Sequence, residues 1–306
     1  MNLGLIAVKS IVKLFIMFAI GVIAAKTKVI DENGSRNMAR LVNKVTNPVR
    51  IFASYLIAYD AVKFRGLISA AELAVLSLAV SVLAGIVFIR KNGDSWRVER
   101  CAVALPNCGY IGIPLISAMF GSEAVFYLTG FILVFNIVAW TYGITVMSGR
   151  TRLKDLLKVL VSPTILAIAA GLCFYLLEIP MPELISSAIK SVGDCTTPLA
   201  MLVAGSTIAR TDFVKILGKA SVWKTSFLRL LFCPVMFSLI CCLIDAPPLV
   251  LQTICIGAAC PCATIVVTQA LAENRSPGLA SGLFAITTIL CAATLPFTIW
   301  LQTLLH

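Results

Sequence analysis

Charged residues, and acidic ones above all, are scarce in this chain. Its 306 residues include 14 Asp and Glu, 25 Lys and Arg, and a single histidine, His306. So few carboxylates and imidazoles leave no recognisable metal-ligand cluster and no catalytic base beside a nucleophile. A Gly-rich nucleotide-binding motif is missing as well. We therefore expect neither an enzyme nor a protein that holds a cofactor or a metal.

Long polar linkers are also missing, so no separate soluble domain is expected. Hydrophobic residues make up 59% of the chain and charged residues 13%, whereas soluble domains have roughly a quarter charged residues. The mean hydropathy is +0.98, and a soluble globule cannot bury that much apolar surface. The eleven cysteines lie mostly in apolar stretches, where they act as small hydrophobes rather than disulfide partners. The composition therefore predicts an integral membrane protein.

Apolar stretches of membrane-spanning length recur along the chain. The expected spans are residues 3–25, 37–59, 66–90, 98–119, 124–147, 160–178, 181–208, 223–244, 248–272 and 277–305. The predicted fold class is therefore an all-α integral membrane protein with ten transmembrane helices.

Basic residues gather in alternate loops. The odd-numbered loops carry Lys26, Lys28, Arg36, Arg40, Arg90, Lys91, Arg97, Arg100, Arg150, Arg152, Lys154, Lys158, Arg210, Lys215, Lys219, Lys224 and Arg275. The even-numbered loops hold only Lys63 and Arg65. Because cytoplasmic loops are rich in Lys and Arg, we expect the odd-numbered loops in the cytoplasm and both termini outside the cell membrane. The net charge of +11 thus indicates orientation rather than a nucleic-acid partner.

The two halves of the chain share landmarks at a nearly constant offset. The pairs are Pro48 with Pro198, Pro106 with Pro261, and Gly130 with Gly282, at offsets of 150, 155 and 152 residues. Five spans in each half place the halves in opposite orientations. We therefore expect two inverted five-helix repeats, residues 1–150 and 151–306.

Spans four and nine carry prolines in mid-membrane. Residues 106–114 read PNCGYIGIP, and Pro261 holds the equivalent place in span nine. Proline removes an N–H and disrupts the preceding turn, so both helices are expected to break there, although a simple kink is the alternative. Unwound backbone persists in a membrane only inside protein or beside water. The free N–H groups of a half-helix favour an anion, and Asn107 adds a neutral amide donor.

Several segments resemble the auxin efflux carrier family, which includes plant auxin carriers and bacterial permeases of the malate and malonate type. They are ALPNCGYIGIPLI in span four, SVGDCTTPLAMLVAG in span seven, SFLRLLFCPVM in span eight and LFAITTILCAATLPFTIW in span ten. The resemblance covers most of the chain. It implies a scaffold part that often dimerises and a transport part in which helices four and nine cross at their breaks. The short polar stretch between the halves resembles that of the bacterial members.

The resemblance also assigns roles to particular residues. It makes Asn107 the substrate-facing amide and places Pro106 and Pro261 at the crossing point. The chain departs from the family at the start of span six, where residues 162–164 read Ser-Pro-Thr and the family usually has Asn-Pro. Either hydroxyl could still cap that helix.

Ionisable side chains within expected spans are functional candidates, because burial there is costly. Arg50 could clasp a substrate carboxylate or pair with a structural partner. Asp194 could bind a proton or a cation, or balance a basic residue such as Arg229 or Lys13. Lys13 shares a helix face with Lys9 and could attract anions to an outer vestibule, whereas Lys9 could snorkel. We expect Arg229 to act in packing or charge balance rather than as a ligand.

Together these features predict a secondary transporter of small organic anions, either mono- or dicarboxylates, that works by alternating access as a homodimer in the lipid bilayer. The candidate substrate-binding residues are Asn107, Pro106, Gly109, Pro261, Cys262, Arg50 and Thr164, and the candidate coupling or charge-network residues are Asp194, Lys13 and Arg229. Asn136, Thr141, Thr268 and Gln269 could line the route or bond across helices.

Three other functions stay open. A sodium-coupled organic-anion symporter of the bile-acid type would share the ten helices, the inverted repeats and the crossed breaks. A ligand-sensing membrane protein could use the same fold, although the sequence shows no output domain. The run Cys260-Pro261-Cys262 could mark a soft-metal transporter, because thiolates suit Cu(I) and Zn.

Overall fold

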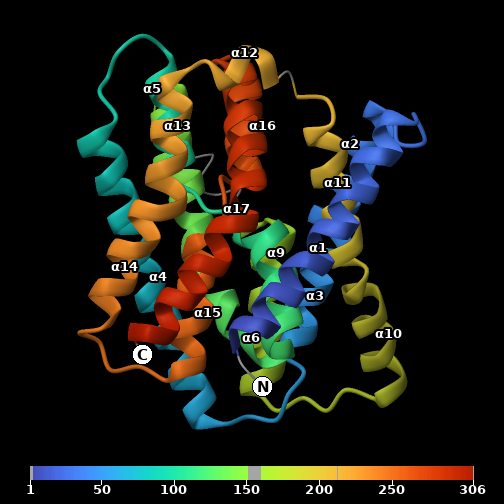
Figure 1. Ribbon diagram of the computed structural model, residues 1–306. Helices are drawn as coiled ribbons and strands as arrows, with labels where there is room; N and C mark the ends of the chain where they lie inside the picture. The colour runs from blue at the N-terminus through green and yellow to red at the C-terminus, as the bar shows by residue number, and fades with distance from the viewer. Residues whose placement is uncertain (1–2, 151–159, 212, 306) are drawn as a thin grey trace.

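The computed structural model describes residues 3–150, 160–211 and 213–305, and within them it contains helices and no strand (Figure 1). The segments long and apolar enough to cross a membrane are Val8–Lys26, Ala61–Phe88, Cys108–Ser148, Ala220–Cys241 and Pro277–Leu305. The described residues are thus all-helical, as predicted, and several of their helices are long and apolar enough to cross a membrane. The ten crossings and their inverted arrangement stay predictions.

Helices occupy every range expected to span the membrane. The first half contains α1 (Leu3–Lys26), α2 (Glu32–Leu41), η1 (Val42–Thr46), α3 (Asn47–Ser54), α4 (Ala61–Phe88), α5 (Ser95–Ala104), η2 (Cys108–Gly112), α6 (Ile113–Val138), η3 (Ala139–Gly143) and α7 (Ile144–Ser148). The second half contains α9 (Pro163–Leu176), α10 (Glu183–Asp194), α11 (Thr196–Ile208), α12 (Phe213–Leu217), α13 (Ala220–Phe227), η4 (Leu228–Phe232), α14 (Cys233–Cys241), α15 (Pro248–Ala259), α16 (Thr264–Ala272) and α17 (Pro277–Leu305). Many expected spans are therefore built from shorter helices.

Prolines and one glycine explain several of these interruptions. The wide turns η1 and η4 lie just before Pro48 and Pro234, whose missing N–H and bulky ring loosen the preceding turn. Gly121 interrupts α6 with φ of 79°, a value that glycine adopts without strain. This kink falls between the ranges expected for spans four and five.

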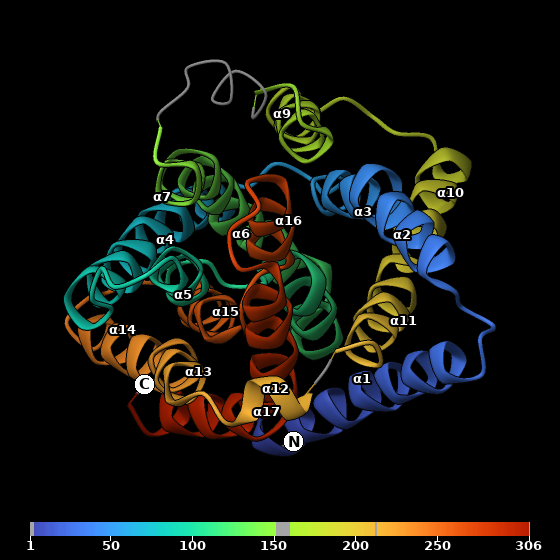
Figure 2. The same cartoon turned by 90° about the horizontal axis from the view of Figure 1, so that it is seen from above.

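The helices form two groups, which Figure 2 shows side by side. Bundle I comprises α1, α2, α3, α9, α10 and α11, and bundle II comprises α4 to α7 and α13 to α17. Within bundle I, α1 and α11 touch closely, because a Cβ on Gly21 would lie only 2.6 Å from Leu202 O. Small residues at such contacts are typical of membrane helices. Helix α6 contacts both bundles and is surrounded by the main apolar core.

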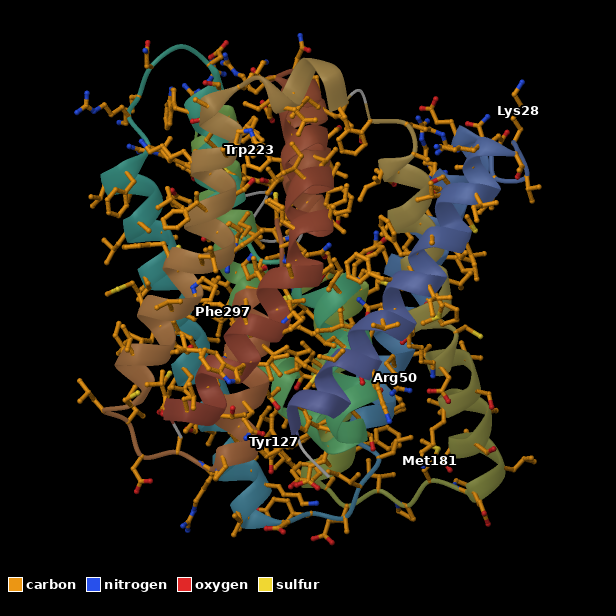
Figure 3. All side chains as sticks on the ribbon, viewed as in Figure 1. Lys28, Arg50, Tyr127, Met181, Trp223 and Phe297 are labelled. Carbon is orange, nitrogen blue, oxygen red and sulfur yellow. The ribbon has the colours of Figure 1, made fainter. Side chains whose placement is uncertain are left out.

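The basic loops share one end of the molecule. In Figure 1 they lie at the top, near the ends of α2, α5, α13 and α16, whereas both chain ends lie in the lower half. Lys28 marks this upper end in Figure 3, and Met181 marks the lower end. The expected basic positions Arg152, Lys154 and Lys158 and the side chain of Lys215 lie outside the described residues. The other basic loops lie together, as their alternation along the sequence predicts.

Candidate functional site

Helices α5 and α15 enter from opposite ends of the molecule and both stop in its interior (Figure 1). Beyond them, residues 105–107 and 260–263 are non-helical, and Pro106 faces Cys262 in an antiparallel bridge. We call these two segments the crossover. Two backbone hydrogen bonds join them: Asn107 N–H donates to Pro261 O at 2.7 Å, and Ala263 N–H donates to Leu105 O at 2.9 Å. The structure thus brings together the two breaks that the prolines predict.

The other backbone donors of the crossover also have partners. The N–H groups of Leu105 and Cys260 turn back to the helices before them, to Cys101 O at 3.0 Å and Gly257 O at 3.4 Å. The Cys262 N–H donates to Thr287 Oγ1 at 3.1 Å. The crossover therefore meets the condition for non-helical backbone inside a membrane, where water cannot supply the missing partners.

Asn107 caps the helical turn that follows the crossover. Its Oδ1 accepts from Tyr110 N–H at 3.3 Å, and its backbone carbonyl accepts from Ile111 and Gly112, each at 3.2 Å. The residue is only 3% exposed, yet its Nδ2 has no hydrogen-bond partner in the described part of the chain. A buried donor without a partner costs about 1–3 kcal/mol. An oxygen atom of a ligand or of water would remove that cost.

A cavity of about 1060 Å³ separates bundle I from bundle II. Tyr110, in the turn after Asn107, and Thr264, the first residue of α16, line its part next to the crossover. Other lining residues come from α2 and from the loop regions near α12, at the upper end of Figure 1. The cavity therefore extends from the crossover towards the end that carries the basic loops.

The first turn of α16 faces this cavity, because both Thr264 and Ile265 line it. The N-cap residue, Ala263, has no side-chain oxygen with which to satisfy the first N–H groups of the helix. The partial positive charge of such an end favours an anion. The site thus combines a helix N-terminus with the neighbouring amide of Asn107.

Six of the predicted substrate-binding residues lie at the crossover, beside it or on the cavity wall. Pro106, Asn107, Pro261 and Cys262 belong to the crossover itself, Gly109 follows in η2, and Thr164 lines the cavity. Ser162 caps α9, because its Oγ accepts from Ile165 N–H at 3.4 Å. The helix that departs from the family pattern is therefore still capped, and by the first of its two hydroxyl residues.

Arg50 lies elsewhere and does not line this cavity. It donates to the carboxylate of Asp194 and to Ser117 Oγ, and it lies in the lower half of Figure 3. The sequence offered Arg229 and Lys13 as examples of a basic partner for Asp194, and the structure pairs Asp194 with Arg50 instead. Lys13 is exposed on α1.

Arg229 is fully buried within bundle II. It donates to Val103 O at 2.7 Å and also to Ala258 O. Both acceptors lie in the last turns of helices that end at the crossover. Arg229 therefore contacts the crossover from the side of α5 and α15.

The structure also assigns the polar residues that had two interpretations. Asn136 and Thr268 line the cavity. Gln269 bonds across helices, donating to Ala139 O at 3.0 Å. Thr141 donates to Ile137 O of its own helix turn at 2.6 Å.

The three aromatic residues of the cavity wall, Tyr110, Trp140 and Phe284, were not singled out from the sequence. Tyr110 lies within the PNCGYIGIP run, so the motif itself carried the signal. Its hydroxyl donates to Ala39 O of bundle I at 3.2 Å. Trp140 gave no such signal, because an aromatic residue in an apolar span commonly faces lipid or core.

Comparison with known proteins agrees with this architecture. The sequence pattern of the family described as membrane transport protein matches residues 6–156 and 150–299. A relative described as an uncharacterized transporter, from Methanothermobacter thermautotrophicus, is 24% identical over 299 residues, which cover 94% of this chain and 96% of the relative. The chain therefore belongs to the membrane transport protein family, that of the auxin efflux carriers, and is a multi-pass membrane transporter.

Proposed function

We propose that this transporter is a secondary carrier of small organic anions that bear a carboxylate. The cavity carries the proposal, because it joins the basic end of the molecule to the uncapped first turn of α16. Asn107, whose buried Nδ2 has no partner among the described residues, bonds through its N–H to Pro261, three residues before this turn. A carboxylate oxygen would accept from both kinds of donor.

The charges on the cavity wall favour an anion over a cation. Arg36, Arg210 and Lys219 line the cavity, together with one carboxylate, that of Glu32. Glu32 is itself paired with Arg36 at 2.9 Å. A cleft lined by an excess of one sign concentrates ions of the opposite sign. These residues would therefore attract an organic anion towards the crossover.

The other residues that line the cavity are neutral. Tyr110, Trp140 and Phe284 offer aromatic surface, and Asn43 and Thr164 offer neutral polar groups. A few polar groups among apolar ones orient an organic ligand, while apolar contact supplies much of the affinity. The wall therefore suits a carboxylate with an organic body better than an inorganic anion.

Contacts between the bundles support alternating access. At the lower end, Arg50 of bundle I donates to Ser117 of bundle II. Tyr55 and Thr129 form a second link there, with their hydroxyls 2.5 Å apart. These contacts hold the bundles together below the cavity while the upper end is open. In the proposed cycle they break as the basic end closes.

The proposed topology follows the loop charges. Ten helices form two inverted repeats, residues 1–150 and 151–306, with both termini outside the cell membrane and the basic loops in the cytoplasm. In this arrangement the cavity opens to the cytoplasm, bundle I is the scaffold, and bundle II carries the substrate. The homodimer stays a prediction.

Purified protein in liposomes tests the function. Malate, malonate and indole-3-acetate are first compared for their effect on the thermal unfolding midpoint, and radiolabelled uptake is then measured with each. We expect stabilisation and saturable uptake for at least one of these acids in sodium-free buffer. Uptake only with sodium would favour the bile-acid type of symporter. If none of a broad panel of carboxylates stabilised the protein or entered the liposomes, the proposal would be wrong.

A further inference from the structure

Arg229 holds the ends of two helices with one side chain. Its guanidinium donates to Val103 O, one residue before the end of α5, and to Ala258 O, one residue before the end of α15. The side chain is 0% exposed. These two helices come from opposite halves of the sequence and meet only where both are broken. A single group therefore joins the two C-terminal ends at the crossover.

The charge of Arg229 is balanced by these helix ends rather than by a carboxylate. Among the residues that the structure describes, no Asp or Glu forms an ion pair with it. Each helix C-terminus carries about half a negative charge, so two together amount to about one. A guanidinium is always charged and presents a rigid fork of donors. Its single positive charge thus matches the two helix ends.

This balance decides the sign of charge at the crossover. Four helix ends meet there: the C-termini of α5 and α15, and the N-termini of α16 and of the helical segment that starts at Cys108. Without Arg229, the two negative ends would largely cancel the two positive ends. With the negative ends neutralised, the positive ends remain, and they face a ligand without competition.

We propose that Arg229 is the positioning residue of the crossover. It fixes α5 against α15, and it neutralises their C-terminal ends so that the crossover attracts anions. The second role rests on the proposed transport of organic anions, whereas the first does not. Arg229 contacts no substrate in this scheme and acts through the two helices that it caps.

Arg100 provides a matched control. It is also buried, at 8% exposure. It also caps a helix end, because it donates to Ile86 O at 3.1 Å and to Ile89 O at 2.8 Å at the end of α4. These acceptors belong to the end of α4 and lie away from the crossover. Arg100 is itself a residue of α5, but it bonds to neither of the helix ends that Arg229 joins. Arg100→Gln therefore reports the general cost of removing a buried arginine from a helix end.

Hydrogen–deuterium exchange of the intact protein tests the positioning role without any ligand. The reporters are the peptides that contain Asn107 and Ala263, whose N–H groups join the two segments. Arg229→Gln should speed exchange in both peptides by roughly tenfold, because local opening becomes easier. Arg100→Gln should leave both unchanged. The positioning role is refuted if Arg229→Gln leaves either peptide unchanged, or if Arg100→Gln loosens them as much.

Arg229→Lys keeps the proposal testable if the Gln variant does not fold. Lysine retains the charge but is a compact point charge that lacks the rigid fork. We expect faster exchange in one of the two reporter peptides and wild-type exchange in the other. Wild-type exchange in both peptides would show that the guanidinium need not bond to both helix ends at once, and would overturn the positioning role.

The charge role is tested by comparing an acid with its neutral amide. Whichever of malate, malonate and indole-3-acetate binds the wild type serves as the probe. Arg229→Gln should reduce the preference for the acid over the amide by roughly tenfold, and Arg229→Lys should keep it. An unchanged preference in Arg229→Gln would overturn the charge role. If no acid binds the wild type, the proposed function fails, while the exchange result still decides the positioning role.

Discussion

Tyr55 donates its hydroxyl proton to Thr129. The two oxygens are 2.5 Å apart, and Thr129 gives its own proton to Phe126 O at 2.6 Å, so Tyr55 must be the donor. Both residues are buried, and the Tyr55 ring also meets the edge of Phe126, with centroids 5.0 Å apart. This hydrogen bond ties the end of α3 in bundle I to α6 in bundle II.

A reporter cysteine should show on which side the cavity is open. Cys173, Cys195 and Cys242 are exposed and are first replaced by serine. Thr264→Cys, on the cavity wall, should then react with a membrane-impermeant maleimide from the cytoplasmic side and not from the outside. Ser77→Cys, at 2% exposure in α4, is the control and should not react from either side. Equal reaction of the Thr264 variant from both sides would contradict a cavity with one opening.

Tyr55→Phe should shift the protein towards the state that is open at the lower end. The variant keeps the aromatic ring and loses one buried hydrogen bond, which contributes about 1 kcal/mol. Labelling of Thr264→Cys from the cytoplasm should fall as the basic end closes more often. Tyr59→Phe is the matched control, because Tyr59 is 40% exposed. Equal labelling in the two tyrosine variants would mean that the Tyr55 hydroxyl does not hold the bundles.

Substitutions of Arg50, Ser117 and Asp194 should differ in how much they lower the thermal stability of the protein. The Asp194 side chain is 67% exposed and that of Arg50 is 17% exposed, and ion pairs near the surface contribute about 0–1 kcal/mol. We expect Asp194→Asn to lower the unfolding midpoint least and Arg50→Gln most, since Arg50→Gln also loses the link to Ser117. Ser117→Ala should lie between them. A folded Asp194→Asn variant that has lost all uptake would instead indicate an ion-coupling role for Asp194.

Two variants of Asn107 should separate the effect of helix capping from the effect of ligand binding. Asn107→Ala loses both the cap on Tyr110 and the free amide, and should weaken binding of a stabilising carboxylate by roughly tenfold or more. Asn107→Asp keeps the capping oxygen and replaces the free donor with negative charge, so it should fold well and bind the anion worst. Ligand titration of the unfolding midpoint measures both effects. Asn92→Ala, in an exposed loop, is the control, and binding like the control in both Asn107 variants would exclude this residue from the site.

Hydropathy and loop charge predicted where the helices lie along the chain, but not how they pack sideways. Helix α1 is apolar around most of its circumference, so its sequence does not tell which face meets another helix. That face is set by the close approach at Gly21, against helix α11, which begins only at Thr196 in the second half of the chain. Such contacts depend on the shape of both partners, which neither segment contains alone.

The candidate site was predictable where backbone chemistry determines it. Proline cannot continue a hydrogen-bonded helix, so Pro106 and Pro261 located both breaks, and the family resemblance implied that the two breaks meet. Side-chain partners were not predictable in the same way. Arg50 bonds to Asp194, which is 144 positions away, and no local pattern connects the two. Which residues line the cavity, Trp140 among them, likewise depends on the spacing between the two bundles, and no local sequence pattern gives that spacing.

The prolines of the crossover also act through the hydrogens that they lack. Two residues facing each other across an antiparallel pair can exchange two hydrogen bonds, but Asn107 and Pro261 exchange only one, because Pro261 has no proton on its nitrogen. The carbonyl of Asn107 is therefore left for Ile111 and Gly112, and the next helix starts from it. An amide proton at position 261 would compete for that oxygen. The N–H that Pro261 lacks therefore both ends α15 and leaves the Asn107 carbonyl free for the helical segment that starts at Cys108.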